Sequence, residues 1–277
     1  MPLLPSGHPG QQHCIRILDF FALPWPGGPE IPEEGDPAEH YAEGVVVLER
    51  AGPSLAAWQR AQANPFVSIP IVRKIIRQVL LALDYLHDGL PGYGIEHTAR
   101  WIEDSGCEPY RSAGSRQVIA AEQVLLCDSY RSFGLTRALD IWAVGVIASL
   151  LILNNNLAWN DLEPRLVNAE YSDPLKHYST TPEVVIALAS INPEAGWPQW
   201  FEEATLYQNN VAGFSFSLPG VHPLPPLEQR IKAEGKIQDS AEVKQIASRL
   251  RSCWVLDPEK RPRAKELLEH EWLKGVA

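Results

Sequence analysis

The residues whose chemistry could support catalysis are His97 and Asp104, which lie in a stretch without a regular apolar pattern. An imidazole can act as a general base, and a carboxylate can accept a proton or bind a cation. No serine or cysteine nucleophile motif accompanies His97, which favours a structural role for this histidine. Asp104 is an isolated carboxylate, and such residues are more often solvated charges than ligands. No G-x-G-x-x-G loop that could cradle phosphates occurs in the sequence.

The four cysteines could in principle serve a metal site or disulfides, but their spacing supports neither. Cys14, Cys107, Cys127 and Cys253 are far apart, with no C-x-x-C pair and no histidine at ligand spacing. We therefore predict that the chain has no metal ligands and that its thiols are free in a reducing compartment.

Charge and composition limit the class of partner. The formal net charge is −10 at pH 7. Nucleic-acid binding needs clustered Lys and Arg, whereas the basic residues here are scattered, so we predict no nucleic-acid partner. An acidic chain is compatible with a basic partner. The apolar content of 45% with nine Trp is enough for a sizeable core.

No segment resembles a membrane span or a secretory signal. The first ten residues lack a basic region followed by an apolar one. The apolar run 140–153 would extend about 21 Å as a helix, against roughly 30 Å of bilayer hydrocarbon. We therefore expect no membrane association and a cytoplasmic or nuclear location.

The elements that must position any site are organised around this same run, DIWAVGVIASLLIL. It is apolar on every helical face, so it predicts a central core helix that is buried on all sides. Asp140 is expected to cap the first turn of this helix, and Asn154 to Asn156 to end it.

Upstream of this helix, the pattern predicts a small β part and one helix. Strands are predicted at 14–21 and at 44–49, the second buried on both faces, with a surface loop at 22–43 between them. A turn and a short helix from Leu55 follow. A longer helix is predicted from Pro70 to His87. Its apolar face comprises Val72, Ile75, Ile76, Val79, Leu80, Leu83 and Leu86.

Downstream, the pattern is less regular until the C-terminal end. Residues 88–117 read as loop, and 154–236 as short helices joined by loops. Two helices, 242–254 and 263–273, then close the chain on either side of a polar turn at 257–262. Asp239 and Glu242 have the spacing of a capping box at the start of the first.

Two motifs, DIWAVGVI (140–147) and DPEKRPRAKELLEHEWL (257–273), together resemble the C-lobe of protein kinases. The stretch 71–87 is similar to the kinase helix that leads to the catalytic loop, and 45–55 to the last N-lobe strand and hinge. HPGQQHCIRILDFF, AGPSL, LDYLH and the pair His97-Thr98 resemble the SR-protein kinases in their fungal form, which belong to the CMGC group of Ser/Thr kinases.

The resemblance covers most of residues 8–275 and implies an α+β, protein-kinase-like fold. Residues 1–53 would form a remnant of the N-lobe β-sheet and the hinge, and 54–277 a mainly helical C-lobe, within a single domain. In this family ATP and Mg²⁺ are the cofactors, and adenine binds the hinge backbone, which corresponds to Glu49 and Ala51 here.

The sequence departs from the family at the catalytic residues. The SR-protein kinase catalytic loop resembles HTDxKPxN, whereas this chain has HTARWIED, with Ala99 at the position of the catalytic Asp and Trp101 at that of the Lys. An alanine cannot accept a proton from a substrate. No DFG motif lies between Asp104 and Glu122. We therefore expect no catalytic residues, no metal ligands and no bound cofactor.

The resemblance also assigns structural roles. Ala120-Ala121-Glu122 corresponds to the APE motif, so Glu122 would form a buried bidentate pair with Arg261. Asp140 would accept hydrogen bonds from the backbone around His97, or act only as a helix cap.

Two functional hypotheses follow. The first is an SR-protein-kinase-like pseudokinase or degenerate fragment without phosphotransfer, which acts by binding a basic, Ser/Arg-rich protein or peptide. The alternative is an active, ATP-dependent Ser/Thr kinase whose gene model has lost the catalytic segments. The abrupt loss of resemblance between Thr98 and Val118 favours this alternative.

Overall fold

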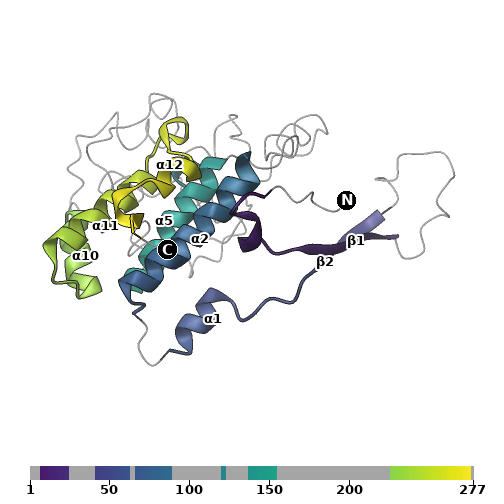
Figure 1. Cartoon of the computed structure of the whole chain (residues 1–277), viewed down its shortest axis with the longest axis horizontal. Helices are drawn as coiled ribbons and strands as arrows, with labels where there is room; N and C mark the ends of the chain where they lie inside the picture. Colours follow the sequence, from purple (N-terminus) through teal and green to yellow (C-terminus); the bar gives the residue numbers. More distant parts are fainter. Residues whose placement is uncertain are drawn as a thin grey trace, which may run out of the picture.

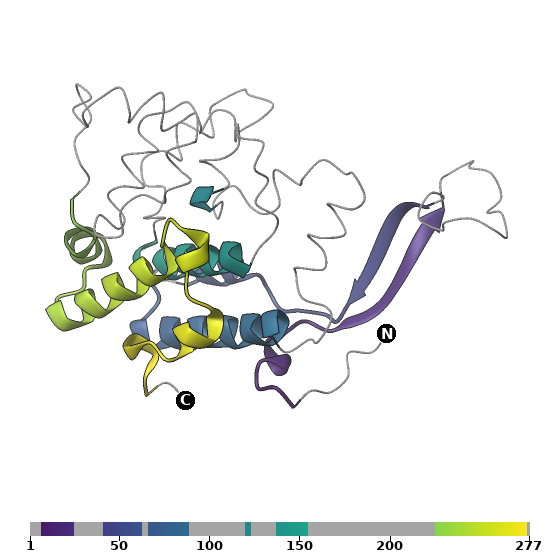
Figure 2. The same ribbon diagram turned by 90° about the horizontal axis from the view of Figure 1, so that it is seen from above.

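The computed structural model describes residues 7–24, 41–62, 66–88, 120–122, 137–154 and 225–275. Within these ranges the chain is mostly helical, and its only sheet is one antiparallel pair of strands. The helices pack side by side, while the strand pair extends away from them (Figures 1 and 2). The mainly helical character expected from the sequence is confirmed, and it is consistent with a kinase C-lobe-like helical region.

Helix α5 (Arg137–Leu153) forms the centre of the core, packing against helices α2 and α11. Ten of its residues are buried, and they lie on all sides of the helix, as the uniformly apolar sequence predicts. The predicted start at Asp140 is wrong, because the helix begins three residues earlier and Asp140 lies inside its first turn. The predicted end is correct, since Asn154 leaves the helix with a left-handed φ of 54°.

Helix α2 (Ile69–Asp88) lies against α5, within one residue of its predicted bounds. The side chains of Val72, Ile76 and Leu80 are fully buried on the predicted face. Leu86, which was expected on the same face, is 38% exposed, although the adjacent Tyr85 and His87 are buried.

Helices α10 (Leu227–Gly235) and α11 (Ser240–Cys253) extend the core, with both packing against α5 and α10 also packing against α11 (Figure 1). All five predicted apolar positions of α11 are buried, namely Val243, Ile246, Ala247, Leu250 and Cys253. Asp239 caps α11 by accepting a hydrogen bond from the backbone N–H of Ala241. The reciprocal half of the predicted capping box is absent from the described contacts, because the Glu242 carboxylate binds Arg73 and Trp272 instead.

The predicted helix 263–273 is wrong as a single element. It consists of a short helix α12 (Ala264–Leu268) and a separate 3-10 turn η6 (Glu271–Leu273). The imidazole of His270 accepts a hydrogen bond from the backbone N–H of Trp272 and so starts a new turn. The polar turn that precedes α12 contains the 3-10 helix η5 (Pro258–Lys260).

Strands β1 (Ile17–Pro24) and β2 (Tyr41–Leu48) pair antiparallel, with Ile17 opposite Leu48. Both strands are displaced from their predicted bounds, and their ends occupy part of the segment expected to be a surface loop. The expectation that the second strand is buried on both faces fails at Leu48, whose side chain is 45% exposed. Leu18 on β1 is 59% exposed.

The segments around the strand pair dock it onto the helices. The 3-10 turn η1 (Gln11–His13) precedes β1 and contacts α2, where Nε2 of His8 lies 3.2 Å from a carboxylate oxygen of Asp84. Helix α1 (Leu55–Arg60) follows β2 where a short helix was predicted, and Ser54 caps it. Asp88, the first residue of the predicted loop 88–117, is the last residue of α2. The rest of that loop, 89–117, and most of 154–236 lie outside the described residues.

Candidate functional site

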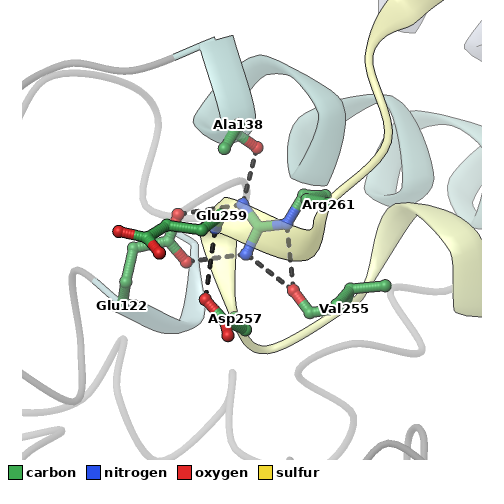
Figure 3. Close-up of polar contacts among 6 residues, drawn as sticks. All are labelled: Glu122, Ala138, Val255, Asp257, Glu259 and Arg261. Atoms are coloured by element: carbon green, nitrogen blue, oxygen red, sulfur yellow. Dashed lines mark hydrogen bonds and ion pairs between the residues drawn. The ribbon is translucent and has the colours of Figure 1, made fainter. Parts of the chain in front are cut away.

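The most developed polar cluster joins Glu122 to Arg261 in the interior (Figure 3). Nη1 of Arg261 donates to Oε1 of Glu122 at 2.9 Å, and Nη2 donates to Oε2 at 2.8 Å. The two side chains are 0% and 1% exposed. This is the bidentate geometry in which a guanidinium and a carboxylate match each other's shape, and the predicted contact is therefore present.

The remaining N–H groups of Arg261 bind backbone carbonyl oxygens at two other points of the fold. Nη1 also donates to Ala138 at the start of α5, at 2.6 Å. Nε and Nη2 both donate to Val255, just after α11, at 3.0 and 2.8 Å. All five N–H groups are thus used, which is what a buried guanidinium requires. The Trp142 ring lies 5.2 Å from the guanidinium carbon and adds a cation–π contact.

The turn that carries Arg261 is held by its own polar contacts. Asp257 accepts a hydrogen bond from the backbone N–H of Glu259 and forms an ion pair with Lys260. This capped turn contains Pro258 at its first helical position, where a missing N–H costs nothing. The turn delivers the Arg261 side chain inward, between α5 and the segment around Glu122 (Figure 3).

A second polar contact ties the end of α2 to the start of α5. Nε2 of His87 lies 2.8 Å from Oδ2 of Asp140, and the imidazole is buried. The Asp140 side chain is therefore a partner of α2 in the described structure rather than a helix cap. Its expected contact with the backbone around His97 lies outside the described residues, as do His97, Ala99 and Asp104 themselves.

The segment proposed as a hinge follows β2. Glu49 accepts from the backbone N–H and the Nε of Arg16, at 3.0 and 2.8 Å, and its own N–H donates to the Arg16 carbonyl. Hydrogen bonding to Arg16 lowers the pKa of Glu49. Ala51 is exposed. These contacts fix the exit of the strand pair, while nucleotide binding by Glu49 and Ala51 stays a prediction.

Sequence reasoning missed several members of these clusters. His87 occurs in the noted motif LDYLH, but no partner could be assigned to it from spacing alone. Ala138 and Val255 contribute only backbone oxygens, for which the sequence carries no signal. The sequence predicts Trp142 to be a core residue, and its cation–π contact with Arg261 is an additional role.

The described residues carry no indication of a metal site or a membrane span. No group of three or more His, Cys, Asp or Glu side chains in these ranges could hold a metal ion. None of the helices in the same ranges is both long enough and apolar enough to cross a bilayer.

Comparison with known proteins gives one partial similarity. No protein-family model matches the chain. Over 91 residues the chain is 32% identical to the protein kinase dsk1 of Schizosaccharomyces pombe, a match that covers 33% of this chain and 14% of that protein. The chain therefore contains a region related in sequence to a protein kinase, and it corresponds to a small part of that relative's length.

Proposed function

We propose that this chain is an SR-protein-kinase-like pseudokinase, which keeps the framework of a kinase C-lobe and acts by binding rather than by phosphotransfer. The observation that carries the proposal is the buried pair of Glu122 and Arg261. The pair joins two motifs, each of which was assigned by its own resemblance to a kinase motif. The contact between His87 and Asp140 supports the same reading, since it anchors both ends of the chain region that corresponds to the catalytic segments.

The absence of phosphotransfer is inferred from the sequence. Ala99 stands where the resemblance requires the catalytic Asp, and a methyl group cannot take the proton from a substrate hydroxyl. Kinases position Mg²⁺ through the Asp of the DFG motif, and no such motif lies between Asp104 and Glu122.

A basic, Ser/Arg-rich peptide is the partner class that fits the charge of the chain. The formal net charge is −10, and residues 25–40, which connect β1 to β2, contain five acidic residues and no Lys or Arg. Such negative charge speeds association with positively charged molecules, so it favours a basic partner over an acidic one.

A phosphotransfer assay with Mg·ATP and a Ser/Arg-rich peptide tests the proposal. We expect no phosphate transfer by the wild-type chain, together with salt-dependent binding of the peptide in fluorescence anisotropy. A peptide with Asp in place of each Arg is the control and is expected not to bind. Turnover that disappears when a residue of this chain is substituted would contradict the proposal.

Calorimetry with Mg·ATP gives a second test. In kinases the triphosphate is held by the Gly-rich loop, a Lys and Mg²⁺. Each charge-assisted contact contributes about 1.5 to 3 kcal/mol, so four missing contacts remove roughly 6 to 12 kcal/mol. A micromolar ligand has only ~8 kcal/mol in total. We expect no binding below millimolar concentration, and a micromolar Kd would contradict the proposal.

The second candidate is an active Ser/Thr kinase whose gene model has lost its catalytic segments. The abrupt change of the sequence after Thr98, and the return of the resemblance at Val118, favour it. Sequencing the transcript across residues 94–120 separates the two candidates, because an intact HTDxKPxN and DFG there would restore the enzyme.

A further inference from the structure

The C-terminal turn η6 is held by an imidazole in one protonation state. Nδ1 of His270 accepts a hydrogen bond from the backbone N–H of Trp272, at 3.2 Å. An imidazole nitrogen can accept only when it carries no proton, so the proton of neutral His270 lies on Nε2. Nε2 is 3.3 Å from Oγ of Ser248 on α11, to which it can donate. Both ring nitrogens are therefore satisfied in the neutral form alone.

The charges around His270 oppose its protonation. Partial burial lowers the pKa of His270, and the guanidinium of Arg249 on α11 lowers it further, whereas Glu271 raises it. Arg249 is itself buried, and its one hydrogen bond in the described structure goes from Nη1 to the carbonyl oxygen of Leu267, at the end of α12. Glu271 is exposed and forms an ion pair with Lys274, which weakens its effect on the imidazole. Protonated His270 would face a buried like charge.

The turn that His270 starts closes one end of the core. Trp272 is only 1% exposed, and Leu273 is buried beside it. The indole Nε1 of Trp272 donates to Oε1 of Glu242 on α11 at 2.9 Å, and Arg73 of α2 lies 5.6 Å from the indole ring. Arg73 in turn binds both oxygens of Glu242, at 2.8 Å each. Detachment of η6 would expose Trp272 and remove one partner from this contact between α2 and α11.

We propose that His270 makes η6 a pH-sensitive latch, which is closed when the imidazole is neutral and opens when Nδ1 takes up a proton. Protonation replaces the acceptor of the Trp272 N–H by a donor, so the two N–H groups then face each other. This inference is independent of the proposed function, because it requires neither a kinase framework nor a bound partner.

One proton is taken up when the latch opens, and this number determines how steeply the opening equilibrium depends on pH. The equilibrium between open and closed turn should change by up to about tenfold per pH unit, in favour of the open form as the pH falls. The change begins near pH 6.5, the ordinary value of the imidazole, and levels off below the lowered pKa of folded His270. Above this window both forms carry a neutral imidazole, and the latch is insensitive to pH.

Amide hydrogen exchange of residues 271–274 in the full chain, corrected for intrinsic exchange rates, measures the open fraction between pH 7.5 and 5. We expect protection of Trp272 and Leu273 to fall with pH in the wild type. It should stay constant in His270→Asn, because an asparagine oxygen accepts the same N–H and does not titrate. His13→Asn is the matched control on η1, and it should keep the wild-type dependence at η6.

Equal pH dependence in the wild type and in His270→Asn would overturn the proposal, as would a wild type whose protection does not change with pH. If His270→Asn does not fold, NMR titration of His270 in the wild type decides the matter. An imidazole pKa below 6.5 that coincides with a shift of the Trp272 amide resonance supports the latch. A pKa at or above 6.5, or an amide resonance that does not follow it, overturns it.

Discussion

Two arginine–glutamate pairs, with the same chemistry and similar distances, lie in opposite environments. Arg261 and Glu122 are 0% and 1% exposed inside the helical core. Arg16 and Glu49, at the base of the strand pair, are 77% and 32% exposed. Water screens the second pair and solvates either partner when the other is removed, whereas neither happens in the core. Distance alone therefore says little about what an ion pair contributes.

Removing the buried cation should have the largest effect. Arg261→Ala leaves the Glu122 carboxylate unpaired in the interior, together with the carbonyl oxygens of Ala138 and Val255. We expect the free energy of unfolding to fall by roughly 3 to 5 kcal/mol, measured by urea denaturation. Arg261→Lys is the matched variant, since it keeps the charge but loses the planar fork, and it should restore only part of the stability. Unchanged stability in Arg261→Ala would show that the pair is not buried.

Crowding the same core with a methyl group should have a smaller effect. A Cβ on Gly145 of α5 would lie 2.5 Å from Nε1 of Trp254 and 2.8 Å from Cβ of Cys253. Gly145→Ala should therefore lower stability by roughly 1 to 3 kcal/mol through overpacking, detected as a lower Tm. Gly52→Ala is the control, since nothing lies within 4 Å of a Cβ there. Equal effects of the two substitutions would contradict the observed packing of α5 against α11.

The contact between His87 and Asp140 is intermediate between the two arginine pairs, because one partner is buried and the other is 40% exposed. His87→Leu keeps an apolar body but loses the hydrogen bond, and water can solvate the carboxylate that remains. We expect a loss of about 1 kcal/mol by chemical denaturation. Asp140→Asn keeps an acceptor oxygen and should be milder, and the reverse order would mean that charge rather than hydrogen bonding holds this contact.

Removing the exposed cation should have the smallest effect. Arg16→Ala deletes the ion pair at the base of the strand pair, but Glu49 then becomes solvated. We expect no resolvable change in the thermal midpoint at 0.15 M salt. The pKa of Glu49, which Arg16 lowers, should return toward its ordinary value, and NMR titration of the carboxyl group detects this. A clear loss of stability would mean that the strand pair is more strongly coupled to the helices than its exposure indicates.

The elements of the core were predictable where one physical signal dominates. The uniformly apolar sequence of α5 and the periodic face of α2 determine burial almost by themselves. The start of α5 was misplaced because Asp is a preferred N-cap residue. Residues 137–139 belong to the helix, but nothing in their sequence indicates this more strongly than Asp140 indicates a cap. The C-terminal helix was predicted too long because the side chain of His270 competes for a backbone N–H, and apolar periodicity does not register such competition.

The polar clusters were predictable only through the family resemblance. Glu122 and Arg261 are separated by 139 positions in the sequence, and no local pattern relates them. The partner of His87 was not predicted for the same reason, although the residue itself lies in a noted motif. The family resemblance predicted the contact between Glu122 and Arg261, whereas the contact between His87 and Asp140 was found only in the structure.

The long separation between Glu122 and Arg261 also has a kinetic consequence. Closing a chain loop of this length costs on the order of 4 kcal/mol in conformational entropy, which must be recovered before the pair contributes anything. We therefore expect the contact to form late in folding, after the local helices, so that the Arg261 substitution accelerates unfolding more than it slows folding. On this expectation, the contact that joins three distant segments affects the lifetime of the native state more than the rate at which that state forms.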